Sequence, residues 1–326
     1  MTELRALITG VAGFAGSHLV EYLAAHTDMD LFGIAREGKE YSSLAQLGNR
    51  VSLHRGDVLS MEFVRSAIRE VKPDYLFHLA GQAAPSHSWT DPASTLVVNT
   101  VGQLNILQAT AAENPTCRVL VPGSGDEYGL VQPSELPVRE SNPLRPINPY
   151  AVSKIAQDML GLQFFVSHRL SVVRVRPFNH IGPRQSEAFV CSSFARQVAE
   201  VELGLREPVV KVGNLEARRD FTDVRDMVRA YWLAVSQGEA GEVYNIGSGC
   251  AWSISDILRS LLNKSHTKIS VEQDPARLRP SDVPEIYCDY SKFFRQTGWK
   301  PLVPLEESLA ELLDYWRLRL REGAGQ

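Results

Sequence analysis

The chain has 326 residues, of which 44% are hydrophobic and 22% charged, a composition typical of a folded protein with one large or two modest domains. Its formal net charge of −4, with no compensating basic block, argues against a nucleic-acid-binding surface. No apolar run approaches the roughly 18–20 residues that span a bilayer. The opening MTELR leads directly into a strand pattern, so we expect neither a signal peptide nor a membrane segment.

The four cysteines lie far apart in the sequence, at Cys117, Cys191, Cys250 and Cys288. They form no CxxC pair, and no histidine stands at metal-ligand spacing. Such cysteines are typical of reduced core thiols, so the sequence predicts a cytoplasmic protein without a metal site.

In the first half of the chain, short apolar runs alternate with amphipathic segments of helical length. Continuously apolar strands separated by helices predict an α/β fold, with a parallel sheet covered on both faces. This is the doubly wound Rossmann architecture, whose ligands bind at the carboxyl ends of the strands. The expected strands are 6–10, 31–35, 51–57, 75–81, 118–124 and 170–178, and the expected helices include 16–26, 61–71 and 94–113.

After about residue 179 the regular alternation ends. Residues 180–190 are typical of a loop, 192–205 of a helix and 209–214 of a strand, and a last amphipathic helix is expected from about 304 to 322. The helix pattern at 223–238 and the following strand in 242–249 form a unit that we expect to return to the main sheet. The sequence therefore predicts a cofactor-binding domain of residues 1–178 plus 223–249, and a smaller α/β substrate-binding domain of residues 179–222 and 250–326.

A glycine-rich segment, TGVAGFAGSHL, lies between the first predicted strand and the first predicted helix. It places Gly10, Gly13 and Gly16 in a GxxGxxG arrangement, which permits a tight turn and lets a pyrophosphate approach the helix N-terminus. Glycine-rich turns are common, but this position in the first strand–helix unit favours a dinucleotide cofactor.

The ends of the second and third predicted strands carry residues that select the cofactor. Arg36 follows the second strand, where an acidic residue is typical of NAD enzymes and an arginine can hold the 2′-phosphate of NADP. The sequence therefore favours NADPH, with NADH as the alternative. Asp57 follows the third strand, where it could accept a hydrogen bond from the adenine amine or cap the next helix.

A tyrosine and a lysine stand four residues apart in NPYAVSK, within a helical pattern. Residues at i and i+4 are neighbours on a helix, so the Lys154 ammonium is expected near the Tyr150 phenol. A nearby cation favours the phenolate, and we expect it to lower the pKa of the phenol from about 10 toward the range of proton transfer.

The segment GSGDEYG follows the fifth predicted strand and supports two hypotheses. Asp126 and Glu127 could be the acid and base of an elimination reaction. Alternatively, Ser124 could be the working group, with the carboxylates in lesser roles.

With these motifs the chain resembles the extended short-chain dehydrogenase/reductase family over essentially its whole length. Further marks of the family are HLAGQ (78–82), Asn99 in VVNTVG, RPFNHIGPR (176–184), RRDFTDVRD (218–226), YNIGSG (244–249) and TGWKP (297–301). The family acts on nucleotide sugars through a Ser/Thr, Tyr and Lys set, which would be Ser124, Tyr150 and Lys154 here. The resemblance implies that Lys154 also holds the nicotinamide ribose.

The resemblance also implies two sets of binding residues. Within the family, the motifs are most similar to those of enzymes that act on GDP-deoxysugars, so the expected substrate is a GDP-sugar. The implied cofactor-binding residues are Gly10, Gly13, Phe14, Ala15, Gly16, Arg36, Asp57, Val58, Leu79, Ala80, Gly81, Asn99, Tyr150 and Lys154. The implied substrate-binding residues are Asp126, Asn179, Arg184, Val190, Asn214, Arg219 and Arg279.

Two departures from the GDP-mannose 4,6-dehydratase pattern favour a reductase of the 4-keto sugar. Aligned on the YG dipeptide, Asp126 takes the position of the catalytic glutamate and Gly125 takes that of its neighbour. In addition, a single Arg36 and the plain loop that follows replace an arginine-rich loop that clasps a neighbouring subunit, which favours a homodimer. A dehydratase remains the first alternative and a nucleotide-sugar 4-epimerase the second.

Overall fold

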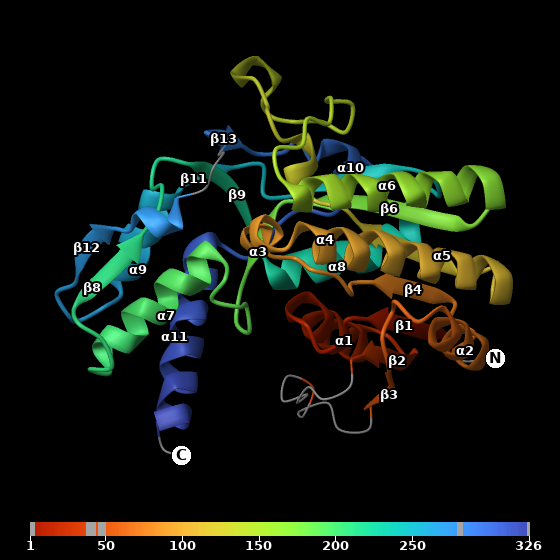
Figure 1. The fold of residues 1–326 in the computed structure, drawn as a ribbon, viewed down its shortest axis with the longest axis horizontal. Helices are drawn as coiled ribbons and strands as arrows, with labels where there is room; N and C mark the ends of the chain where they lie inside the picture. The colour runs from red at the N-terminus through yellow and green to blue at the C-terminus, as the bar shows by residue number, and fades with distance from the viewer. Residues whose placement is uncertain (1–3, 37–43, 45–49, 279–282, 325–326) are drawn as a thin grey trace.

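The computed structural model describes residues 4–36, 44, 50–278 and 283–324. Its largest sheet has seven strands in the order β10-β6-β5-β4-β1-β2-β3, and all neighbours are parallel (Figure 1). The doubly wound prediction is therefore confirmed. The strands are β1 (Arg5–Thr9), β2 (Asp30–Ala35), β3 (Val51–Arg55), β4 (Tyr75–His78), β5 (Arg118–Pro122), β6 (Ser171–Pro177) and β10 (Val243–Ile246).

Helices cover both faces of this sheet, which is why its central strands β1, β4 and β5 are largely apolar, whereas the edge strand β3 is mostly exposed. One face packs against α1 (Phe14–His26) and α8 (Val224–Gln237), around a core that includes Leu19, Leu23 and Met227. The opposite face packs against α2 (Met61–Val71), α5 (Gly102–Glu113) and α6 (Pro149–His168).

The strand order reverses between β1 and β4. These strands lie side by side although α1, β2, β3 and α2 separate them in the chain. The loops that leave these two strands turn to opposite sides, and the crevice between them is where doubly wound proteins bind ligands. The glycine-rich turn follows β1, and the segment HLAGQ begins at the last residue of β4.

The predicted helix 94–113 is not regular. It consists of α4 (Pro92–Leu96), a π-helical turn (Val97–Val101) and α5, and the short helix α3 (Pro85–Thr90) precedes it. The π-helical turn contains Asn99, whose buried side chain bonds to the backbone of Gln82. Such turns recur where a helix serves a functional site.

The remaining elements form a second part around its own apolar core, at the left of Figure 1. Its helices are α7 (Val190–Glu202), α9 (Ile254–Asn263) and α11 (Leu305–Ala324). Beside them, β8 (Val209–Val212) pairs with β12 (Ser270–Gln273), and β9 (Arg218–Asp223) pairs with β7 (Asn179–Ile181), β11 (Ala251–Ser253) and β13 (Glu285–Ile286).

The strand β7 corrects the expectation of a loop from residue 180. Asn179 to Ile181 extend because they pair with Phe221 to Asp223, about 40 residues further on, and no local pattern announces a partner so distant.

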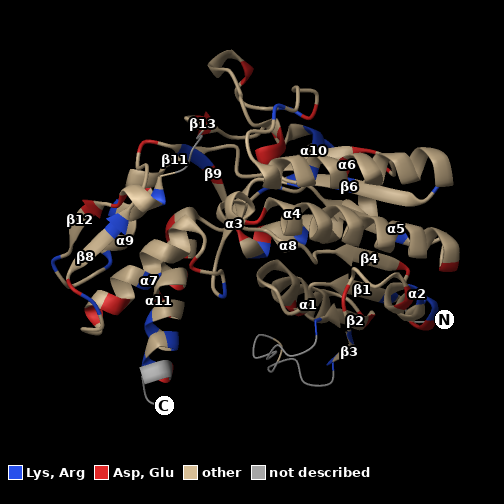
Figure 2. Ribbon diagram, viewed as in Figure 1, with Lys and Arg blue, Asp and Glu red and all other residues tan. Residues whose placement is uncertain are grey.

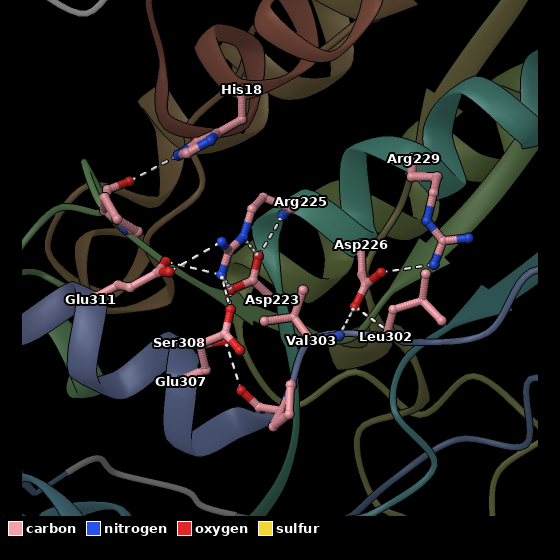
Figure 3. Close-up of polar contacts among 12 residues, drawn as sticks. His18, Asp223, Arg225, Asp226, Arg229, Leu302, Val303, Glu307, Ser308 and Glu311 are labelled. Atoms are coloured by element: carbon pink, nitrogen blue, oxygen red, sulfur yellow. Dashed lines mark hydrogen bonds and ion pairs between the residues drawn. The ribbon is translucent and has the colours of Figure 1, made fainter. Parts of the chain in front are cut away.

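The two parts are joined at the start of α8 (Figure 3). Asp223 caps α8 through the Arg225 N–H at 2.7 Å and accepts from the Ser308 hydroxyl of α11 at 2.6 Å. Asp226, one turn along α8, accepts from the backbone N–H groups of Leu302 and Val303. Two buried carboxylates thus hold the C-terminal segment against α8.

A short C-terminal stretch packs with the first part of the molecule. Phe293, in α10 (Ser291–Thr297), and Trp299 are fully buried in the core around α1 and α8. Lysine and arginine are interspersed with aspartate and glutamate over both parts (Figure 2). Among the helices described, none has the length and apolar character that crossing a membrane requires.

Candidate active site

A cavity of about 760 Å³ lies at the carboxyl ends of β1, β4, β5 and β6 and extends to α7 and the end of β8. This volume is in the range of small-molecule sites. The cavity brings together most of the residues that the sequence singled out. Those that line it are Gly10, Gly13, Phe14, Ala15, Gly16, Leu79, Ala80, Gly81, Ser124, Asp126, Tyr150, Lys154, Asn179, Val190, Asn214 and Arg219.

The glycine turn fits a bound pyrophosphate. Gly10 has φ +66°, and a Cβ there would lie 2.8 Å from the Ala80 nitrogen. A Cβ on Gly16 would lie 2.3 Å from the Gly10 carbonyl oxygen, so helix and turn approach each other as only glycine allows. Gly13 is the N-cap of α1 and offers no side chain to its first turn, which leaves the backbone N–H groups to an anion.

Ser124, Tyr150 and Lys154 meet at the end of β5. Ser124 is the N-cap of a 3-10 turn (Gly125–Tyr128), and its hydroxyl accepts from the Asp126 N–H at 3.1 Å. Tyr150 is in the first turn of α6, which Asn148 caps. The Ser124 side chain favours the ionised form of Tyr150 and so acts to lower the pKa of its phenol. Because the Ser124 oxygen already accepts from a backbone N–H, the hydroxyl proton is available to a partner in the cavity.

The pKa of Tyr150 departs from the expectation. Burial is the main cause, and it raises the pKa of the phenol, with the Asp126 carboxylate acting in the same direction. The Lys154 ammonium is 5.9 Å from the Tyr150 ring centroid and donates instead to the Pro122 carbonyl and the Gln157 side chain. The expected lowering by the i+4 lysine is therefore wrong for this structure, and Tyr150 stands as a neutral phenol.

The two carboxylates of GSGDEYG have separate environments. Asp126 is half-buried and lines the cavity. Glu127 is fully buried, accepts from the Ser124 N–H at 2.8 Å and from Arg176 Nε at 3.0 Å, and is absent from the lining. One carboxylate therefore faces a ligand, and the other faces the interior.

Four predicted cofactor residues lie outside the lining. Val58 is buried, and Asn99 supports Gln82 from behind, with Ser153 as its third partner. Asp57 does not cap α2, because Ser60 does so; Asp57 instead accepts from the Leu59 N–H at 2.9 Å. Arg36 is exposed at the end of β2, and the loop after it, used above to predict a dimer, is largely outside the described residues.

Three of the predicted substrate residues are arginines. Arg184 has φ +74° and is not in the lining; it forms a bidentate pair with Glu21 of α1, at 2.5 and 2.7 Å. Its assignment to the substrate stays a prediction. Arg279 lies outside the described residues. Arg219 lines the cavity and donates to the Val283 carbonyl at 2.6 Å.

Several lining residues had no assigned role in the sequence analysis. His180 stacks on Phe14 with ring centroids 5.6 Å apart and planes 5° from parallel, which joins β7 to the first turn of α1. Its position beside Asn179 was the only available signal. Trp89, which follows the fourth strand and from there could line a sugar pocket, does line the cavity, and so do Gln82 of the HLAGQ motif, Gln185, Phe189 and Arg277.

A parallel Rossmann sheet, a glycine turn at the first helix and a Ser, Tyr and Lys group at the end of β5 define an enzyme of the extended short-chain dehydrogenase/reductase type. The family model described as GDP-mannose 4,6 dehydratase matches residues 7–312. The chain belongs to this family.

Known proteins show the same relationship. The chain is 38% identical to the GDP-6-deoxy-D-mannose reductase of Pseudomonas aeruginosa, over 99% of this chain and 100% of that protein. It is 27% identical to the GDP-mannose 4,6-dehydratase of Yersinia enterocolitica, over 95% and 92% of the two chains. The solved structure of RMD from Pseudomonas aeruginosa complexed with NADPH superposes with a TM-score of 0.84 and 36% identity, covering 97% of this chain and 99% of that one.

Proposed function

We propose that this protein reduces the C4 keto group of GDP-4-keto-6-deoxy-D-mannose with NADPH and forms GDP-D-rhamnose. The observation that carries the choice of a reductase is the divided orientation of Asp126 and Glu127. An elimination needs an acid/base residue in addition to the tyrosine. Glu127 is bound inside the protein by Ser124 and Arg176, so the segment GSGDEYG offers the cavity only the shorter Asp126.

The chain's own residues supply the proton and the charge stabilisation. When bound, NADPH supplies a hydride to the carbonyl carbon. Tyr150, neutral because of its burial, gives its proton to the carbonyl oxygen as negative charge develops there. Ser124 donates a hydrogen bond to the same oxygen. The Lys154 ammonium, 5.9 Å from the Tyr150 ring centroid, would hold the nicotinamide ribose, and solvent returns the proton to Tyr150.

Cofactor selection rests on the edge of the sheet at β2 and β3. Ala35 pairs with Arg55, so Arg36 and Arg55 stand at adjacent strand ends. Two guanidinium groups there suit the 2′-phosphate of NADPH, to which each can donate two hydrogen bonds.

The nucleotide of the substrate is assigned to the second part of the molecule. Asn214 and Arg219 line the cavity from that side, together with Asn179 and Val190. Binding of the GDP moiety there, far from C4, would orient the sugar and so contribute to the rate. The first part accordingly holds the cofactor and the second the GDP-sugar.

The protein is further assigned as a cytoplasmic homodimer. The four cysteines are free thiols, which suits a reducing compartment. Exposed apolar side chains on α6 and on the neighbouring π-helical turn suit a second copy of the chain.

The deciding experiment follows nicotinamide absorbance in two reactions with the purified protein. One contains NADPH and GDP-4-keto-6-deoxy-D-mannose, and the other contains GDP-mannose and no reductant. We expect stoichiometric loss of NADPH in the first and no conversion in the second. Formation of the keto sugar from GDP-mannose would identify a dehydratase instead. Asp126→Asn separates the two further, because it should abolish a dehydratase and leave most of a reductase's activity.

A further inference from the structure

The carboxylate of Glu127 is buried directly beneath the catalytic group, and the mechanism above does not use it. Glu127 has no exposed surface, and each of its two oxygens accepts a bond from a different element of the fold. Oε1 accepts from the Ser124 N–H at 2.8 Å, and Oε2 accepts from Arg176 Nε of β6 at 3.0 Å.

Arg176 is itself fixed by a buried ion cluster. Its guanidinium pairs with Asp158 of α6 at 2.6 Å and bonds to the Tyr128 hydroxyl at 3.1 Å. Asp158 also pairs with Arg174 at 2.7 Å. Because the residues that hold the Glu127 carboxylate are themselves held in place, β6 and α6 together fix its position.

The same carboxylate determines where the Ser124 hydroxyl lies. Ser124 and Glu127 form a reciprocal capping box, in which the glutamate holds the serine N–H and the serine hydroxyl accepts from the turn. There is little space between Gly123 and this carboxylate, because a Cβ on Gly123 would lie 2.0 Å from Glu127 Oε1. Moving the carboxylate therefore moves the backbone that carries the hydroxyl.

We propose, on the basis of the reductase function above, that Glu127 is a positioning residue that acts through Ser124, fixing its hydroxyl against Tyr150 and the carbonyl oxygen of the substrate. Glu127 itself touches neither substrate nor cofactor. Both carboxyl oxygens act as acceptors, so an amide in place of the carboxylate turns one acceptor into a donor that faces the Ser124 N–H or the Arg176 Nε–H.

The test is a double-mutant cycle between Glu127→Gln and Ser124→Ala, read as kcat and KM for the keto sugar. We expect E127Q alone to lower kcat by about 100-fold, as a misplaced catalytic group does, with KM changed by less than about threefold. In the S124A background, E127Q should lower kcat by less than about threefold further, since the hydroxyl that it positions is gone. Equal losses in both backgrounds would overturn the proposal.

Glu202→Gln is the matched control, because it makes the same change at a carboxylate that pairs with Arg317 in the second part of the molecule and leaves the bond between Glu127 and Ser124. It should lower the midpoint of thermal unfolding and change kcat by less than about threefold. A loss of kcat as large as that of E127Q would mean that the loss in E127Q reports destabilisation and not the position of Ser124, and would overturn the proposal. Should E127Q fail to fold, Gly123→Ala displaces the carboxylate without removing its charge, and the same cycle with S124A decides.

A second readout does not need turnover, so the proposal can be judged even if the wild-type protein fails to oxidise NADPH with this sugar. Hydrogen exchange at the Ser124 amide reports whether the Glu127 bond is intact. We expect exchange to speed up at least about tenfold in E127Q and to stay unchanged in E202Q. Unchanged exchange in E127Q would overturn the proposal independently of the reaction.

Discussion

The two hydroxyls at the end of β5 have unequal chemical tasks. Tyr150 transfers a proton, whereas Ser124 donates a hydrogen bond that strengthens as charge builds on the carbonyl oxygen. We expect Tyr150→Phe to lower kcat by about 10³-fold or more, because it removes the hydroxyl that gives the proton. Ser124→Ala should cost about 100-fold. Steady-state kinetics with the keto sugar measures both.

This interpretation requires that both variants still bind NADPH. Neither substitution should change the affinity for NADPH, measured by quenching of protein fluorescence, by more than about threefold. Near-normal turnover in Y150F would mean that another group donates the proton.

Lys154 gives the reaction a pH dependence. Burial lowers the pKa of its ammonium to about 8, and the nearby Glu127 carboxylate opposes the shift. A lysine loses its charge as the pH rises through this value, so kcat should fall above about pH 8. Tyr150 does not contribute to this limb, because its pKa is raised. A profile of kcat from pH 6 to pH 10 measures this fall, which we expect to reach about 100-fold.

An arginine in place of Lys154 tests whether the lysine causes the alkaline fall in kcat. In Lys154→Arg the guanidinium keeps its charge throughout, so the residual rate should be flat across the alkaline range. An alkaline fall that persists in this variant would assign the limb elsewhere.

At the scale of elements, the sequence predicts what depends on local pattern. The apolar runs of β1 to β6 and the glycine turn are found where they were expected, because burial on both faces and a close helix approach each leave a mark on neighbouring residues. Strand β7 was not predicted, because the strand with which it pairs is distant in sequence. The pKa of Tyr150 was misjudged because helical spacing places Lys154 beside the ring, whereas the Pro122 carbonyl and Gln157 decide where the ammonium points.

The link between α1 and the turn after β7 makes a further prediction. Arg184 pairs with Glu21, and His18 of the same helix bonds to the Pro183 carbonyl at 2.9 Å. We expect Arg184→Gln and Glu21→Gln to lower the free energy of unfolding equally, by about 1 kcal/mol each, because each breaks the same partly exposed pair. Urea denaturation measures the change.

The same two variants test the substrate role that the sequence assigned to Arg184. If the pair is structural, calorimetry should find GDP affinity within about twofold of wild type in both. Weaker GDP binding in R184Q with normal binding in E21Q would restore Arg184 to the substrate site.

At the scale of the whole molecule, the cavity depends on two parts that are held in one arrangement. The catalytic group comes from β5 and α6, the cofactor turn from β1 and α1, and the predicted GDP contacts from β8 and β9. Asp223 and Asp226 bind the C-terminal segment to α8, and Glu21 and His18 bind α1 to the segment that enters the second part. Sequence could predict the members of each part, but the contacts between them follow only from the fold.

The exposed apolar face of α6 predicts the assembly. Val152, Met159 and Val166 are 46%, 39% and 67% exposed and stand seven residues apart, so they share one side of the helix. Val97 and Val101, 46% and 40% exposed, lie on the π-helical turn that packs beside α6. A patch of this kind is typical of a surface that a partner covers, and two copies of a helix pair can cover each other. We expect sedimentation to give twice the chain mass of 36.2 kDa.

Met159→Glu places a charge at the centre of this face and should yield a folded monomer, because a carboxylate buried between two apolar helices costs several kcal/mol, of the order of what holds such a dimer together. Leu318→Glu is the control. Leu318 is 59% exposed on α11, in the second part of the molecule, and its substitution should leave the dimer intact. A dimer that survives M159E and dissociates with L318E would place the interface on α11 instead.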